Sequence, residues 1–212
     1  MCGIVGAISN RNVDTILMEG LRRLEYRGYD SAGIAIIEKK QINRIRRAGK
    51  VKKLQDAIDQ NALSGKTGIS HTRWATHGIP SENNAHPHLS DPDFALVHNG
   101  IIENYNDIKN NLIDRGYKFT SDTDTEAVVH LIHSHFDTQK DLFMAVKATI
   151  EELEGAYALA VISTHEPEKI VVARSGCPVV IGIGENENFV ASDVAALLME
   201  TNEFMFLEEG DV

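Results

Sequence analysis

Residues 157–191 read YALAVISTHEPEKIVVARSGCPVVIGIGENENFVA. Four short runs rich in apolar or β-branched residues recur in this stretch, at 157–163, 170–173, 179–183 and 188–191. Gly, Pro and Asn residues separate the runs, and no helical pattern lies between them. Because consecutive strands without intervening helices pair antiparallel, the sequence predicts an α+β fold rather than a doubly wound α/β fold.

The rest of the chain alternates further strand and helix patterns. Asn12 is positioned to cap the first helix, and a turn at 39–41 separates two strands. The predicted strands are 3–8, 32–37, 42–48, 67–72 and 94–98, and the predicted helices are 13–24, 51–58, 105–115, 125–135, 141–153 and 194–199. Residues 73–93 form a long polar segment rich in His, Pro and Asn, and connections of this length are usually functional. We therefore expect one domain with functional residues in that segment.

Composition excludes several classes of function. The 212 residues are 42% hydrophobic and carry a formal charge of -10, which opposes binding to nucleic acid or to an anionic membrane. The basic residues between 44 and 53 are expected on a solvated strand face and at a helix start. No apolar run approaches the roughly 20 residues of a membrane span, and no secretory signal begins the chain. Two cysteines are too few for a disulfide framework, so we expect a cytoplasmic protein.

Cys2 is the first candidate for chemistry, because it directly follows the initiator methionine. Removal of Met1 would leave a thiol and a free α-amine on one residue. An α-amine has a pKa of about 7.7 to 8.0 and can accept the thiol proton, which gives a nucleophile with its own base. The alternative is that Cys2 is a small buried hydrophobe at the start of a strand. The other cysteine, Cys177, precedes a proline in an apolar stretch and is interpreted as structural.

Two polar clusters follow predicted strands. In residues 73–78, Arg73 could clamp a substrate carboxylate while Trp74 covers the site, or the two could form a surface stack. In residues 98–104, Asn99 and the Gly100 N–H could donate to a developing oxyanion. Asn-Gly is also the commonest hairpin turn, and taken alone the turn is favoured.

A third cluster, residues 121–126, precedes a helix pattern. Asp124 there is either a helix N-cap or the acceptor of a substrate ammonium group. The nine histidines form no metal-binding motif, so no metal is predicted.

Residues 1–6, 71–78, 98–100 and 123–126 together resemble the class II glutamine amidotransferases, which are N-terminal nucleophile hydrolases. Residues 21–33 and 84–88 are similar to the glucosamine-6-phosphate synthase branch of that family. The resemblance covers essentially the whole chain and implies a glutaminase domain over 2–212. It also implies a four-layer αββα sandwich, with two antiparallel sheets between helical layers, and no cofactor.

The resemblance implies a role for each matched residue. The thiol of Cys2 attacks the carboxamide carbon of L-glutamine, and its α-amine moves the proton to the leaving ammonia through a water. Asn99 and the Gly100 N–H hold the oxyanion. The remaining roles are carboxylate binding by Arg73, Thr76 and His77, ammonium binding by Asp124, closure over the substrate by Trp74, and support by Arg27 and His86.

The resemblance also implies partners. Ammonia would pass to sugar isomerase domains absent from this chain, which convert fructose 6-phosphate to glucosamine 6-phosphate, and the full-length enzyme would be a homodimer. Two alternatives remain. The chain is an amidotransferase domain with another acceptor, as in amidophosphoribosyltransferase or asparagine synthetase, or it is a glutamine-binding module that does not cleave glutamine because Met1 is retained.

Overall fold

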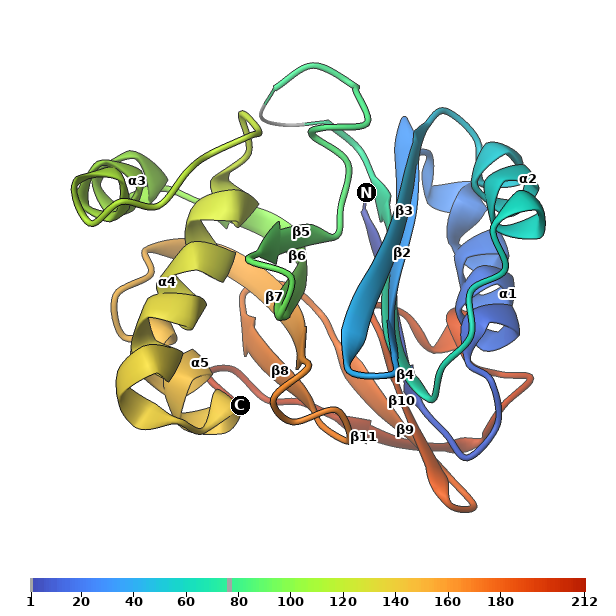
Figure 1. The fold of residues 1–212 in the computed structure, drawn as a ribbon. Helices are drawn as coiled ribbons and strands as arrows, with labels where there is room; N and C mark the ends of the chain where they lie inside the picture. Colours follow the sequence, from blue (N-terminus) through green and yellow to red (C-terminus); the bar gives the residue numbers. More distant parts are fainter. Residues whose placement is uncertain (1, 76–77) are drawn as a thin grey trace.

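Two antiparallel sheets lie face to face between two helical layers in the computed structural model, which describes residues 2–75 and 78–212 (Figure 1). The larger sheet has the strand order β11-β9-β10-β1-β4-β2-β3 and the smaller one β5-β6-β7-β8. The strands are β1 (Gly3–Ile8), β2 (Ser31–Glu38), β3 (Gln41–Ala48), β4 (Thr67–Arg73), β5 (His88–Ser90), β6 (Phe94–Ile102), β7 (Gly155–Ser163), β8 (Ile170–Ser175), β9 (Val180–Gly184), β10 (Glu187–Ala191) and β11 (Glu203–Phe206). The helices are α1 (Asp14–Leu24), α2 (Val51–Gln60), α3 (Tyr105–Asp114), α4 (Asp124–Gln139) and α5 (Leu142–Ile150), with 3₁₀ turns η1 (Glu25–Arg27) and η2 (Val194–Ala196).

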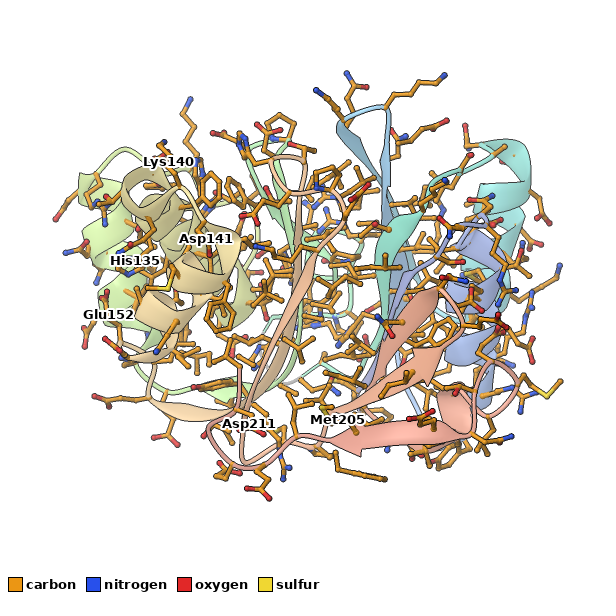
Figure 2. All side chains as sticks on the ribbon, turned by 90° about the horizontal axis from the view of Figure 1, so that it is seen from below. His135, Lys140, Asp141, Glu152, Met205 and Asp211 are labelled. Atoms are coloured by element: carbon orange, nitrogen blue, oxygen red, sulfur yellow. The ribbon has the colours of Figure 1, made fainter. Side chains whose placement is uncertain are left out.

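Three apolar layers hold this sandwich together. Helices α1 and α2 pack on the outer face of the larger sheet, where Leu17 and Leu21 belong to one buried cluster with Ile34. Helices α3 to α5 cover the outer face of the smaller sheet in a second cluster. The third cluster lies between the sheets and includes Ile69 and Val97. Seen from below, side chains fill the space between the layers (Figure 2). The four-layer αββα prediction is confirmed.

Strand β4 brings polar residues into the space between the sheets. Successive strand residues point to opposite faces, so His71 and Arg73 share the inner face with the core residue Ile69. Ser70 points the other way, and its hydroxyl donates to the carbonyl of Leu17 on α1 at 3.4 Å. The inner face of this one strand therefore supplies a core residue, Ile69, and then the polar residues His71 and Arg73 toward its end.

The predicted cap and turn at the first elements need correction. Helix α1 begins at Asp14 with Val13 as its N-cap residue, and the side-chain oxygen of Asn12 instead accepts from the N–H of Gly65 at 2.8 Å. Asn12 therefore fixes the loop before β4 and does not cap the helix. The hairpin β2–β3 turns on two residues, Lys39 and Lys40, which have φ values of 49° and 64°.

Asn99 and Gly100 do not form a hairpin turn. Strand β6 continues through them to Ile102, and they pair with Ala158 and Tyr157 of β7. The competing turn interpretation was therefore wrong, because β7 continues alongside β6 past this point. Two short strands, β5 and β11, had no counterpart in the sequence prediction, and the predicted helix at 194–199 is only the 3₁₀ turn η2.

The basic face of β3 is not simply solvated. Arg44 donates to the carbonyl of Pro87 at 3.2 Å, and Arg46 donates to the carbonyls of Asn83 and Ala85 at 2.9 Å. Burial lowers the pKa of Arg46 to about 10. The two arginines thus anchor the polar segment before β5, and the prediction of a solvated face was wrong for them. Across residues 2–75 and 78–212, no helix has the length and apolar character needed to cross a membrane.

Candidate active site

Cys2 lies where the larger sheet places it, one residue before β1. Strand β1 is paired on both edges, with β10 and β4, and Gly3 stands opposite Thr72. This register brings the Cys2 side chain to the end of β4, where Sγ accepts the main-chain N–H of Trp74 at 3.2 Å. A sulfur that accepts an N–H is stabilised as the thiolate.

Two side chains hold the main chain of Cys2. Arg27 Nη1 and Asn99 Nδ2 both donate to the Cys2 carbonyl oxygen, each at 3.3 Å. Arg27 is itself fixed by an ion pair with Asp193 at 2.7 Å, and the hydroxyl of Tyr26 donates to the same carboxylate at 2.7 Å. The structure therefore brings Arg27 and Asn99 together around the candidate nucleophile.

Burial raises the pKa of the Cys2 thiol, and the Trp74 N–H and the charge of Arg73 oppose that rise. Since a thiol ordinarily has a pKa near 8.5, the folded protein holds this one protonated at neutral pH. Nucleophilic attack from Cys2 therefore needs a base, which a free α-amine on the same residue would provide.

Arg73 brings a buried positive charge into the site, with only 3% of the residue exposed. Burial lowers its pKa, and the charges of Asp30, Cys2 and Asp124 counteract this. Asp30 also fixes the chain around Arg73. Its N–H donates to the Arg73 carbonyl at 2.8 Å, and its carboxylate accepts from the N–H of Ala75 at 2.6 Å.

Asp124 is the first residue of α4 and not its N-cap, which is Thr123. One carboxylate oxygen accepts the N–H of Thr125 and the other the N–H of Ile102, both at 2.9 Å. Each carboxylate oxygen has a second lone pair, so the group can still receive an ammonium ion. The bond to Ile102 joins α4 to the end of β6, just after Gly100.

Gly100 occupies a position that no other residue fits. Its φ is 126°, and a Cβ atom placed there would lie 1.9 Å from the carbonyl oxygen of Ala156. The close approach of β7 therefore requires glycine after Asn99. Trp74 lies 54% exposed at the rim, with its indole against Gly28. Thr76 and His77 lie outside the described residues.

His86 is buried behind this cluster and does not face Cys2. Its ring bonds to His71 at 3.1 Å on one side and to Thr125 Oγ1 at 2.8 Å on the other. His71 in turn bonds to the side-chain oxygen of Asn99 at 2.9 Å. The sequence reasoning assigned no role to His71, Asp30 or Asp193. His71 and Asp30 fall inside the quoted motif blocks, whereas Asp193 carries no local signal.

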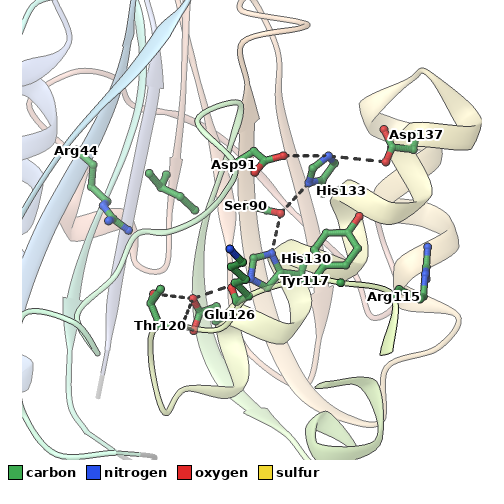
Figure 3. Close-up of a pocket in the computed structure, with 13 residues that line it drawn as sticks. Arg44, Ser90, Asp91, Arg115, Tyr117, Thr120, Glu126, His130, His133 and Asp137 are labelled. Atoms are coloured by element: carbon green, nitrogen blue, oxygen red, sulfur yellow. Dashed lines mark hydrogen bonds and ion pairs between the residues drawn. The ribbon is translucent and has the colours of Figure 1, made fainter. Parts of the chain in front are cut away.

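Three histidines of α4 bond to other side chains. His130 and His133 both bond to the hydroxyl of Ser90, at 2.7 Å and 2.8 Å, and His135 bonds to Glu152 at 2.7 Å. Among the residues that the structure describes, no three His, Cys, Asp or Glu side chains are arranged to hold a metal ion. A cavity of about 700 Å³ beside His130 and His133 includes none of the residues around Cys2 (Figure 3).

Comparisons with known proteins agree with this geometry. A family model described as a glutamine amidotransferase domain matches residues 71–199. The glutamine–fructose-6-phosphate aminotransferases (isomerizing) of Shewanella oneidensis and Pseudomonas putida are 60% and 56% identical to this chain over its whole length. The chain spans only 35% of the length of each.

Solved structures of other proteins share this fold. A glutamine phosphoribosylpyrophosphate amidotransferase from B. subtilis is 26% identical, with a TM-score of 0.83 over 98% of this chain and 46% of its own. A class-II glutamine aminotransferase domain protein from Silicibacter pomeroyi, 14% identical with a TM-score of 0.65, shares the fold over 97% of this chain and 91% of its own.

Proposed function

This chain belongs to the glutamine amidotransferase domain family, and on that premise we propose that it hydrolyses L-glutamine to glutamate and ammonia with Cys2 as nucleophile. The observation that carries the proposal is the convergence on Cys2. Its sulfur accepts the N–H of Trp74, and Asn99 Nδ2 donates to its carbonyl oxygen at 3.3 Å. A nucleophile and a donor for a developing oxyanion therefore stand side by side.

The reaction begins at the carboxamide carbon of glutamine. Once Met1 is removed, the Cys2 α-amine takes the thiol proton, and Sγ forms a bond to that carbon. The oxyanion receives N–H donors from Asn99 and Gly100. The C–N bond then breaks, the α-amine returns the proton to the leaving nitrogen, and ammonia departs from a γ-glutamyl thioester. Water hydrolyses the thioester to glutamate and restores the thiol.

The two charged ends of glutamine select the substrate. Arg73 is a buried cation that can bind the α-carboxylate with a bidentate pair of bonds, aided by Thr76 and His77. Asp124 receives the α-ammonium group on the lone pairs that its backbone partners leave unused. Trp74 covers the bound amino acid.

We further propose that residues 2–212 are the glutaminase part of a longer cytoplasmic enzyme. Relatives of nearly three times this length are glutamine–fructose-6-phosphate aminotransferases. The ammonia would therefore aminate fructose 6-phosphate at a sugar isomerase part of a dimeric enzyme. The high identity to these relatives favours this acceptor over a phosphoribosyl acceptor, because the phosphoribosylpyrophosphate amidotransferase is only 26% identical.

Glutamate release by the protein lacking Met1 tests the first proposal. Cys2→Ala should abolish release, whereas Cys177→Ser, a change at the other free cysteine, should leave it unchanged. Release by Cys2→Ala at the wild-type rate contradicts the nucleophile. Mass spectrometry of the intact N-terminus tests the alternative of a glutamine-binding module that does not cleave glutamine. That alternative requires that Met1 is retained, that glutamine binds and that no glutamate forms. With fructose 6-phosphate added, this chain alone should form glutamate but no glucosamine 6-phosphate.

A further inference from the structure

A chain of buried side chains leads away from Asn99 into the protein, and it begins at the side-chain oxygen of Asn99. His71 Nε2 lies 2.9 Å from that oxygen, and His71 Nδ1 lies 3.1 Å from His86 Nδ1. His86 Nε2 lies 2.8 Å from Thr125 Oγ1, which lies 3.0 Å from His98 Nδ1. We call these four residues the histidine chain: His71, His86, Thr125 and His98.

The position of the proton in each hydrogen bond of the histidine chain follows from the bond before it. The carbonyl oxygen of Cys2 can only accept, so the Asn99 atom that faces it is Nδ2, and Oδ1 faces His71. His71 must then carry its proton on Nε2, which leaves Nδ1 to accept from His86 Nδ1–H. His86 Nε2 is left without a proton and accepts the hydroxyl of Thr125.

The far end of the chain fits the same direction. Because the Thr125 proton points at His86, its oxygen accepts the N–H of His98 Nδ1. A Thr125 bond to Asp124 would run in the opposite direction, but that separation is longer, at 3.4 Å. All bonds therefore point toward Asn99, and a reversed chain would turn the Asn99 oxygen toward the Cys2 oxygen.

Burial keeps the rings of His71 and His86 neutral. His71 is fully buried and His86 only 4% exposed. Desolvation lowers the pKa of His71 to about 3 and that of His86 well below its ordinary value. Neutral rings can each donate once and accept once, as the chain requires, whereas a protonated ring would donate twice and break the sequence of bonds.

We propose that His71 is a positioning residue for glutamine hydrolysis, which the histidine chain holds as a donor so that the Asn99 amide presents its N–H to the oxyanion. An amide can rotate by half a turn at little steric cost, and the rotated form would offer an oxygen to a developing negative charge. The N–H of His71 disfavours the rotated form, because rotation would place the Asn99 nitrogen, which is also a donor, opposite His71 Nε2. The inference rests on the proposed glutaminase activity.

A double-mutant cycle separates positioning from general structural damage. His71→Ala should lower kcat about 10- to 100-fold with little change in KM, since a mobile Asn99 donates less often to the transition state. In an Asn99→Ala background, the same change should alter kcat less than about twofold. His71→Gln, whose amide nitrogen can replace Nε2–H, should restore kcat to within about threefold of wild type. Equal losses in both backgrounds would overturn the proposal.

A second pair of variants covers the case in which His71→Ala does not fold. Thr125→Val removes the hydroxyl at constant shape and should lower kcat, whereas Thr125→Ser keeps the hydroxyl and should not. Equal kcat for the valine and serine variants contradicts the chain.

Nitrogen-15 NMR of the histidine rings tests the chain without any turnover, so its result stands even if the proposed function fails. His71 should be neutral and protonated on Nε2 from about pH 5 to about pH 8. His135, which bonds to Glu152 at 2.7 Å and lies beside it in Figure 2, gives the comparison signal of a ring outside the histidine chain. Protonation of His71 on Nδ1 instead would overturn the proposal.

Discussion

Replacing Gly100 with alanine should damage stability and activity together. The new Cβ would start 1.9 Å from the Ala156 oxygen, and such contacts are essentially never below 3.0 Å, so β6 and β7 must separate by about 1 Å. Overpacking of this kind costs about 1–3 kcal/mol, and holding alanine at a φ of 126° costs a further 1–3 kcal/mol or so. We expect a loss of about 2–6 kcal/mol in the free energy of unfolding.

Activity should fall at least about 100-fold in the folded Gly100→Ala protein, because a displacement near 1 Å moves the neighbouring Asn99 amide. Urea denaturation and glutamate release measure the two effects. Gly116→Ala is the matched control, since Gly116 has a φ of 93° and no atom within 4 Å of its added Cβ. It should lose only about 1–2 kcal/mol and keep full activity. Equal destabilisation of both variants would refute the steric reasoning.

Three further predictions concern acid stability, the support of Arg27 and the first hairpin. Burial lowers the pKa of His71 to about 3 from 6.5, so between these values the unfolded chain binds a proton that the folded one does not. The free energy of unfolding should therefore fall as pH drops below about 6.5, by up to about 1.4 kcal/mol per unit, and His71→Gln should flatten the measured slope. Asp193→Asn should lower the free energy of unfolding by about 1–2 kcal/mol and slow glutamate release, because Arg27 loses its charged partner. An unchanged rate of glutamate release would argue against the support of Cys2 by Arg27. Replacing Lys39 and Lys40 with Asn-Gly should raise the unfolding free energy by about 1 kcal/mol without affecting activity, since both lysines have positive φ; thermal unfolding checks this.

Sequence patterns predicted the elements that have a strong apolar signal. The strand at residues 3–8 was found because it is a short continuous apolar run, and the amphipathic α2 because its apolar residues recur at helix spacing. Strand β11 was missed because its four residues lie at the edge of a sheet and remain largely exposed, which leaves no alternation to detect. The Asn-Gly pair misled in isolation, because only the pairing of β6 with β7 decides that the strand continues.

Residues of the candidate site were proposed from the sequence where they stand in short motifs. Arg73, Asn99 and Asp124 were selected because each lies at the end of a strand or the start of a helix. The partners of Arg27 and Asn99 were not predicted, because Asp193 contacts Arg27 across 166 positions of sequence and His71 reaches Asn99 across 28. Such contacts depend on the neighbours of β1 and on the facing of the two sheets, which spacing along the chain does not encode.

The central place of β4 ties the lifetime of the site to that of the whole protein. Strand β4 lies between β1 and β2, so its backbone is bonded along both edges while its inner side chains include His71 and Arg73. Amide hydrogens in such a strand exchange with solvent only when the domain opens globally. The free energy of opening measured by hydrogen exchange at β4 should therefore match the free energy of global unfolding measured by urea denaturation under the same conditions.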